Sequence, residues 1–89
     1  MVRYSPSAKK TKYVKRLGWA VYDDLYPVNT NDTIVCKDFT DDSNMLQTLL
    51  VDDSDGSTVT TSTALNVVTV TETVSNIHCT LFVYGVRED

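Results

Sequence analysis

TVTTSTALNVVTVTET, residues 58–73, is the stretch that decides the fold class. Threonine and valine dominate it, and their branched β-carbons favour a pleated strand over a helix. Valine and threonine alternate over residues 68–71, which is the two-residue period of a strand with one buried face. Asn66 is expected to divide the stretch into two strands, with residues 62–65 forming the turn between them.

Four other segments have the composition of strands. Residues 77–84 (IHCTLFVY) carry apolar side chains on both faces, which predicts a central strand covered on both sides. The other three segments are residues 19–26 (WAVYDDLY), expected to end before Pro27, residues 33–39 (TIVCKDF) and residues 45–51 (MLQTLLV).

Turn-forming residues separate these segments. The pair Asp55-Gly56 can adopt positive φ angles, which predicts a type I′ hairpin turn. About five to seven short strands at this spacing predict an all-β fold, either a small antiparallel β-sandwich or a barrel-like fold.

The charged residues divide the chain into two parts. Residues 1–16 carry six lysines or arginines and no acid, whereas residues 17–89 carry all twelve carboxylates against two cations. The net charge of −4 therefore conceals a basic N-terminal arm (1–16) joined to an acidic β-domain (17–89). Clustered like charges repel one another unless a partner neutralises them, so the asymmetry indicates a binding surface.

The basic arm allows two conformations. Ser7 could cap a short helix that ends at Gly18, or the segment could be extended and disordered until it meets a partner. The second alternative is favoured, because short helices with adjacent lysines are marginal in water. The candidate partner-binding residues are the cations and aromatic anchors of this region, namely Lys9, Lys10, Lys12, Tyr13, Lys15, Arg16 and Trp19.

Motifs for catalysis or metal binding are missing from the sequence. The acidic loop 52–56 lacks the ligands that a calcium-binding EF-hand frame requires, since Val51 and Ser62 would stand at its two ends. Structural zinc usually takes four ligands, whereas the chain has two cysteines and one histidine. No phosphate-binding loop or nucleophile elbow is present. We therefore expect a protein that is not an enzyme, with no catalytic residue, cofactor or metal.

The location of the protein is predicted from hydropathy and from the N-terminal residues. No apolar run approaches the roughly 18 to 20 residues that cross a bilayer. Residues 1–6 (MVRYSP) lack the hydrophobic segment of a secretory signal. We expect a soluble protein without a signal peptide or a membrane partner, in which Cys36 and Cys79 are free thiols.

Three segments carry a resemblance to a known class of protein. They are residues 55–57 (DGS), 66–71 (NVVTVT) and 77–86 (IHCTLFVYGV). Their strand pattern resembles the ends of small structural proteins of tailed bacteriophages, over about a third of the chain. The resemblance implies a virion component assembled in the host cytoplasm: a capsid decoration or cement protein, or a head–tail accessory subunit. It transfers no site residues.

Three functions are consistent with the sequence. The expected one is a non-enzymatic assembly protein that docks on a protein lattice of capsid or tail subunits through its basic arm and also self-associates. The second is a small nucleic-acid-binding protein, in which lysines meet phosphates and tyrosines stack on bases, although the acidic domain would repel nucleic acid. The third is an adhesin-like host-recognition module, for which Tyr22, Tyr26 and Phe39 are the candidate exposed aromatics.

Overall fold

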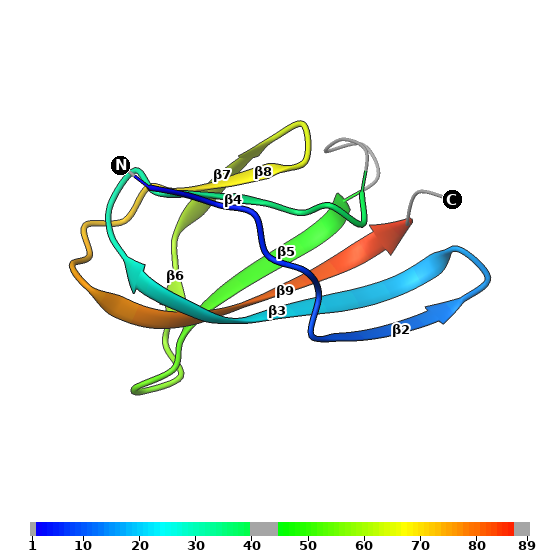
Figure 1. Ribbon diagram of the computed structural model, residues 1–89, viewed down its shortest axis with the longest axis horizontal. Helices are drawn as coiled ribbons and strands as arrows, with labels where there is room; N and C mark the ends of the chain where they lie inside the picture. Colours follow the sequence, from blue (N-terminus) through cyan, green and yellow to red (C-terminus); the bar gives the residue numbers. More distant parts are fainter. Residues whose placement is uncertain (1, 40–44, 87–89) are drawn as a thin grey trace.

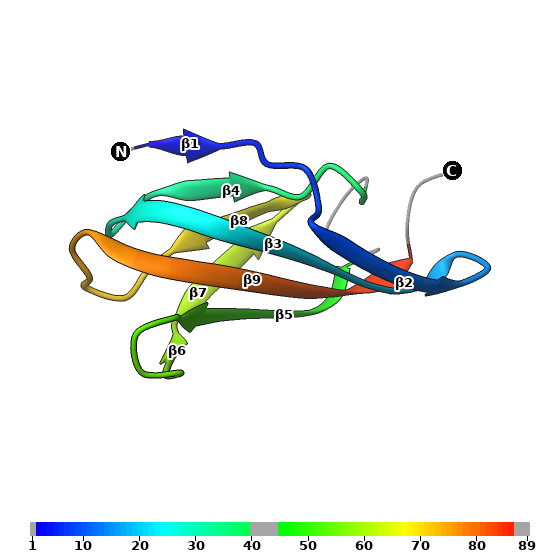
Figure 2. The same cartoon turned by 60° about the horizontal axis from the view of Figure 1, so that its bottom comes forward.

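The protein is built from two β-sheets that pack face to face (Figures 1 and 2). The computed structural model describes residues 2–39 and 45–86, which form nine strands and no helix. The first sheet has the order β1 (Arg3–Tyr4), β4 (Thr33–Val35), β8 (Val67–Val70) and β7 (Thr61–Ala64). The second sheet has the order β2 (Lys10–Val14), β3 (Leu17–Val28), β9 (Ile77–Val86), β5 (Met45–Asp52) and β6 (Thr58–Val59). The all-β prediction is confirmed.

The strand pairs are antiparallel, except that β1 lies parallel to β4. The long strands β3, β9 and β5 form the middle of the five-stranded sheet. Strand β9 therefore has the central position that its sequence predicts.

The core lies between the two sheets and is formed by the side chains that point inward from each. In β9 these are Cys79, Leu81 and Val83, and in β8 they are Val68 and Val70. Burying apolar surface in this way is the main force that holds such a fold together. The remaining buried apolar side chains are Ala20, Tyr22, Leu25, Val28, Ile34, Cys36, Phe39, Met45, Leu50 and Val59.

The prediction that residues 77–84 are covered on both sides is wrong. Phe82 and Tyr84 are exposed, whereas Leu81 and Val83 are buried. The reason is that β9 belongs to one of only two layers, so the other sheet covers just one of its faces.

Several strand limits also differ from those predicted. Strand β3 continues through a cis Tyr26–Pro27 peptide to Val28, which pairs with Ile77. Strand β4 stops at Val35, because the following residues form a turn in which the Phe39 N–H donates to the Cys36 carbonyl over 3.1 Å.

The turns of the two later hairpins are placed differently as well. Residues 62–64 belong to β7, so the turn before β8 consists of Leu65 and Asn66. The loop between β5 and β6 is longer than the predicted two-residue turn. Within it, Gly56 has a φ of 76°, and Asp55 Oδ1 accepts hydrogen bonds from the N–H and hydroxyl of Ser57 over 2.9 and 2.7 Å. These bonds lower the pKa of Asp55 and stabilise the longer loop.

Residues 2–16 do not project from the sheets as a separate basic arm. Strand β1 extends the four-stranded sheet, and β2 pairs with β3 over its whole length. The predicted boundary at residue 16 falls in the two-residue turn of the β2–β3 hairpin, where Lys15 has a φ of 60°. Backbone pairing of β1 with β4 and of β2 with β3 holds most of this segment against the two sheets, so the structure shows it neither as a helix nor as a disordered chain.

Candidate protein-binding face

The side of the five-stranded sheet that is turned away from the core is the candidate functional surface. Side chains alternate between the two faces of a strand, so the buried Ala20 and Val83 place their neighbours Trp19 and Tyr84 on the outside. We call this surface the outer face. Its central part comprises Lys10, Lys12, Trp19, Val21, Gln47, Leu49, Phe82 and Tyr84.

Strand register arranges these side chains in two rows that cross four strands. In both rows a lysine from β2 lies at the edge, and apolar side chains from β3 and β9 follow it. The first row is Lys12, Trp19, Tyr84 and Gln47, and the second is Lys10, Val21, Phe82 and Leu49. The pattern places cations directly beside aromatic and aliphatic side chains.

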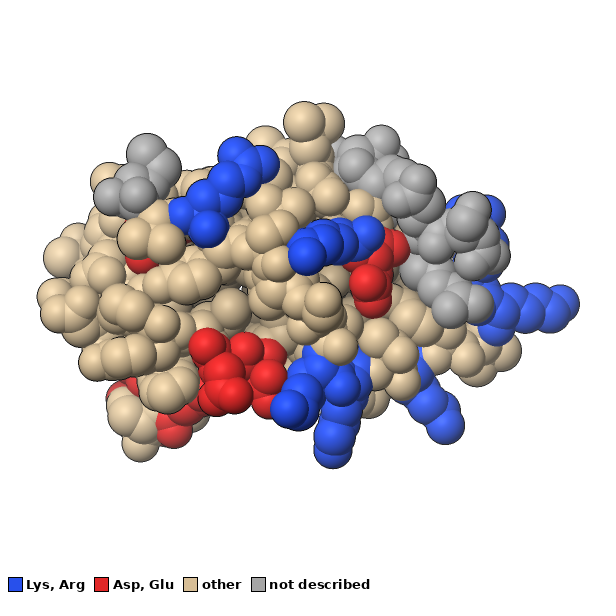
Figure 3. Space-filling view, in the orientation of Figure 1, with Lys and Arg blue, Asp and Glu red and all other residues tan. Residues whose placement is uncertain are grey.

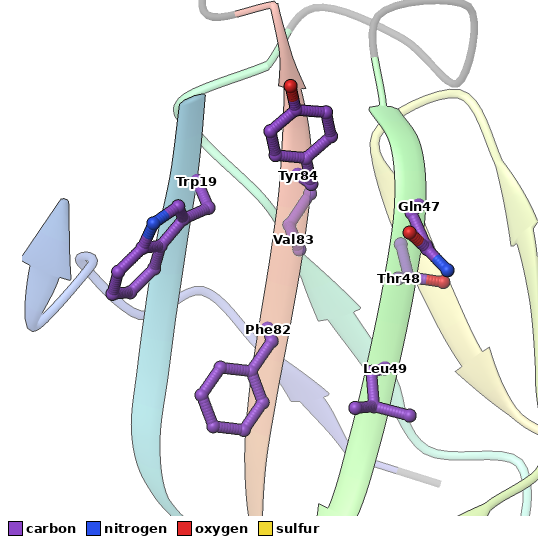
Figure 4. Close-up of a pocket in the computed structure, with 7 residues that line it drawn as sticks. All are labelled: Trp19, Gln47, Thr48, Leu49, Phe82, Val83 and Tyr84. Carbon is purple, nitrogen blue, oxygen red and sulfur yellow. The ribbon is translucent and has the colours of Figure 1, made fainter. Parts of the chain in front are cut away.

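A shallow depression of about 510 Å³ lies on this surface (Figure 4). Trp19 is 38% exposed, Phe82 39%, Tyr84 42% and Leu49 43%, although each is a large apolar or aromatic side chain. Thr48 and Val83 complete the lining together with Gln47. Exposed large apolar groups that are contiguous, rather than scattered singly, mark surfaces for protein contact.

Carboxylates occupy the end of the outer face away from the lysines. Thr80 and His78 point outward because Cys79 between them is buried. The Thr80 hydroxyl donates to Asp53 Oδ1 over 2.7 Å, and Asp24 Oδ1 lies 3.7 Å from His78 Nε2. Both acids therefore border the outer face at the His78 end of β9. Figure 3 shows this division on the lower side of the molecule, with carboxylates to the left and lysine or arginine side chains to the right.

The structure brings together some of the partner-binding residues predicted from the sequence. Lys10, Lys12 and Trp19 lie side by side on the outer face. Lys9 precedes β2, where its N–H donates to the Val21 carbonyl over 2.7 Å. Lys15 and Arg16 form the exposed turn of the β2–β3 hairpin, because Val14 pairs with Leu17 and leaves two residues between the strands.

Tyr13 does not belong to the outer face. It is half-buried opposite Gly18, and its hydroxyl donates to Asp38 Oδ2 over 3.3 Å. As an odd-numbered residue in β2 it points to the opposite side from Lys10 and Lys12. Its position helps to hold β2 against the body, and Tyr13 is not an aromatic anchor of this surface.

Sequence reasoning missed Leu49, Phe82 and Tyr84 as surface residues and Asp24 and Asp53 as its acidic border. The relevant signal was present, because residues 77–84 are apolar at alternate positions on both faces. That pattern was interpreted as double burial, but a sheet in a two-layered fold with one open apolar face gives the same pattern.

The two thiols are core groups. Cys36 and Cys79 are free and buried, and burial is the main cause that raises the pKa of each thiol to about 12. Nearby negative charges contribute to this rise in pKa: Asp38 at Cys36, and Asp52 and Asp53 at Cys79. Thiols with such pKa values remain protonated at neutral pH and are poor nucleophiles. Within residues 2–39 and 45–86, no three His, Cys, Asp or Glu side chains gather as they would around a metal ion.

The aromatics proposed for host recognition are mostly internal. Tyr22 and Phe39 are buried in the core, and burial raises the pKa of Tyr22 well above its ordinary value. Tyr26 is exposed and stacks on the ring of His78, with a centroid separation of 4.9 Å. This leaves one of the three candidates on the surface.

Comparisons with known proteins supply no family for the chain: no family model matches it, and neither a curated protein nor a solved structure does so. The resemblance to phage structural proteins therefore stays a prediction. In the described part of the chain there is also no helix of the length and hydrophobicity that spanning a membrane requires.

Proposed function

We propose that this protein is a non-enzymatic assembly protein that docks on a protein lattice through its outer face. The observation that supports the proposal most directly is the exposed apolar surface formed by Trp19, Leu49, Phe82 and Tyr84 on a regular, paired sheet. Aromatic side chains bury a large area at little entropic cost, and they are enriched where proteins meet. In agreement with the phage resemblance, the lattice that we propose is a capsid or tail surface of a virion.

The basic segment has a different part in this proposal from that of a flexible arm. Lys10 and Lys12 are held in a strand at the border of the apolar surface, so they do not lose the entropy of ordering a free chain on binding. Rim charges of this kind steer association and set its specificity more than they add to affinity. We therefore assign affinity to the aromatic centre and orientation to the lysines.

Nucleic acid remains the second candidate, because Lys12 lies beside Trp19, and lysines beside aromatics suit a single strand. Asp24 and Asp53 border the same surface and would repel phosphates, so the outer face suits a protein better. Nucleic-acid binding would show as an affinity that falls steeply with salt.

Site-specific photo-crosslinking tests the proposed function. A benzophenone amino acid is placed at Leu49, on the outer face, and in a control variant at Ser62, which is exposed on β7 of the other sheet. Irradiation in the cells that make the protein should yield a defined protein adduct from position 49 that co-purifies with assembled particles, and none from position 62. Equal adducts from both positions, or none from position 49, would contradict the proposal.

A further inference from the structure

We propose that the lattice neighbour on the outer face is a second copy of this chain, packed face to face about a two-fold axis. This inference rests on the proposed function, because it names the partner of the same surface. Its starting point is the uneven distribution of charge around the apolar centre, with cations at one end and carboxylates at the other.

The position of each charged group along the strands is fixed by contacts. Lys12 lies in the row of Tyr84, and Lys10 in the row of Phe82. The Asp53 carboxylate accepts from Thr80, and the Asp24 carboxylate lies beside His78, which places the acids one and two rows further along β9. Phe82 is therefore near the middle of the charged pattern as well as of the apolar surface.

This arrangement is complementary to itself. The lysines lie on β2 and the acids lie beside β9, so the line that joins the two groups runs diagonally to the strands. Two identical faces can meet about a two-fold axis that lies in the plane between them, passes near Phe82 and runs at right angles to this diagonal. The axis exchanges the two ends of the face, so Lys10 and Lys12 of each copy meet the Asp24 and Asp53 end of the other. The apolar centres then cover each other, and the two Phe82 rings come together at the axis.

Other kinds of partner suit the surface less well. An acidic protein would be attracted by the lysine end and repelled by Asp24 and Asp53. A basic protein would be attracted by the two aspartates and repelled by the lysines. A partner must itself have both charges at the right spacing, and a second copy meets this condition by symmetry. A small domain with a limited core also gains stability from such burial, because association stabilises the folded state by mass action.

Charge-swap variants of the purified protein test the inference, with sedimentation equilibrium as the measurement. The cation variant combines Lys10→Glu with Lys12→Glu, and the acid variant combines Asp24→Lys with Asp53→Lys. The wild type should be a dimer at micromolar concentration. Each variant alone should be mainly monomeric, with the dimer dissociation constant raised about tenfold or more, because its face then carries a single sign of charge.

Mixing the two variants provides the decisive measurement. In the mixed pair, the new glutamates of one copy face the new lysines of the other, and the native lysines face the native aspartates. An equimolar mixture should therefore form heterodimers with a dissociation constant within about threefold of that of the wild type, and salt should weaken them. A mixture that stays monomeric, or single variants that dimerise as well as the wild type, would overturn the inference.

Phe82→Gln serves as a further variant that leaves every charge in place, should a charge variant fail to fold. Phe82 is exposed, so this change should abolish the dimer at micromolar concentration. At concentrations low enough for the wild type to be monomeric, it should leave the unfolding midpoint nearly constant. A dimer that survives Phe82→Gln would also overturn the inference.

The crosslinking experiment separates this inference from the proposed function. An adduct at position 49 between two copies of the chain supports both. An adduct with a different protein only, together with a monomeric wild type, overturns the self-pairing and leaves the docking function standing. The absence of any adduct from position 49 overturns both.

Discussion

Asp32 shows how one side chain can organise a loop and the start of the chain together. Its side chain is 1% exposed, and its carboxylate accepts hydrogen bonds from the Val2 N–H over 2.8 Å and from the Asn29 N–H over 2.9 Å. The backbone of the same residue accepts from the Val70 N–H over 2.9 Å. A buried carboxylate is tolerated when it is hydrogen-bonded in this way. The Asp32 carboxylate links the residue before β1 to the loop before β4, and the Asp32 carbonyl links this loop to β8.

Replacing this carboxylate should lower stability without affecting the outer face. Asp32→Ala leaves two backbone N–H groups without their acceptor, and we expect it to reduce the free energy of unfolding by about 2 to 4 kcal/mol in urea titrations. Asp32→Asn keeps one acceptor oxygen and should lose about half as much. A change below about 0.5 kcal/mol for Asp32→Ala would show that Asp32 does not have this role.

At the scale of the element, β2 depends on a close approach between two backbones. A β-carbon built on Gly18 would lie 1.9 Å from the carbonyl oxygen of Lys12 and 2.6 Å from the Cα of Tyr13. Any side chain at position 18 would therefore push β2 away from β3. Because β2 carries Lys10 and Lys12, this glycine also holds one border of the outer face in place.

We expect Gly18→Ala to detach β2 while the rest of the fold persists. Overpacking at such a contact costs about 1 to 3 kcal/mol, and here the clash is with backbone, which has little room to move. Hydrogen exchange should become faster for residues 10–14 and stay slow for β8 and β9. Thr11→Ala, an exposed change in the same strand, is the control and should alter neither. Unchanged protection of residues 10–14 in Gly18→Ala would refute the close contact.

The sequence predicted elements where a local pattern and the tertiary environment agree. Valine and threonine alternation identified β8, and the run 77–84 identified the central strand β9. Prediction from the sequence failed where strand pairing outweighs composition. Six cations in sixteen residues indicate a solvated arm, yet an edge strand such as β2 can pair with β3 on one side and keep its charged side chains in water.

Turns were predicted less well, for a related reason. Leu65, with a φ of 55°, and Lys15, with a φ of 60°, start two-residue turns although neither residue type favours positive φ. In the first case Asn66 compensates, because its side-chain amide donates to the carbonyls of Cys36 and Phe39 over 3.3 and 3.0 Å. Such long-range bonds leave no trace in a single sequence.

The candidate site was predicted only in part, because it combines residues that are far apart in the sequence. Lys10, Lys12 and Trp19 were named, but their apolar neighbours come from β5 and β9.

At the scale of the whole molecule, the core makes stability depend on pH. Burial raises the pKa of Cys36 and of Cys79 to about 12 from an ordinary value of 9.0, so each thiol holds its proton more tightly when folded. Their contribution to stability is therefore complete below about pH 9 and is lost as the pH rises from 9 towards 12. Tyr22 acts in the same direction at higher pH.

Urea unfolding measured in steps from pH 7 to pH 11 should show a free energy that is flat near pH 8 and then declines. The double variant Cys36→Val and Cys79→Ala removes both thiols, so its decline should be shallower even if its stability at pH 8 is lower. A slope identical to that of the wild type would show that the thiols do not cause the decline.

The pairing of β3 with β9 places Leu17 opposite Val86, and this has a consequence for synthesis of the protein. Translation adds about 5 to 20 residues per second, so β3 waits roughly 3 to 12 seconds before β9 is complete. During that time the apolar stretch WAVY at residues 19–22 has no native neighbour from the end of the chain. Asp23 and Asp24 follow it directly and place two charges inside the strand. Charges that flank an apolar strand act against aggregation, so we expect this acidic pair to protect the nascent chain until β9 is made.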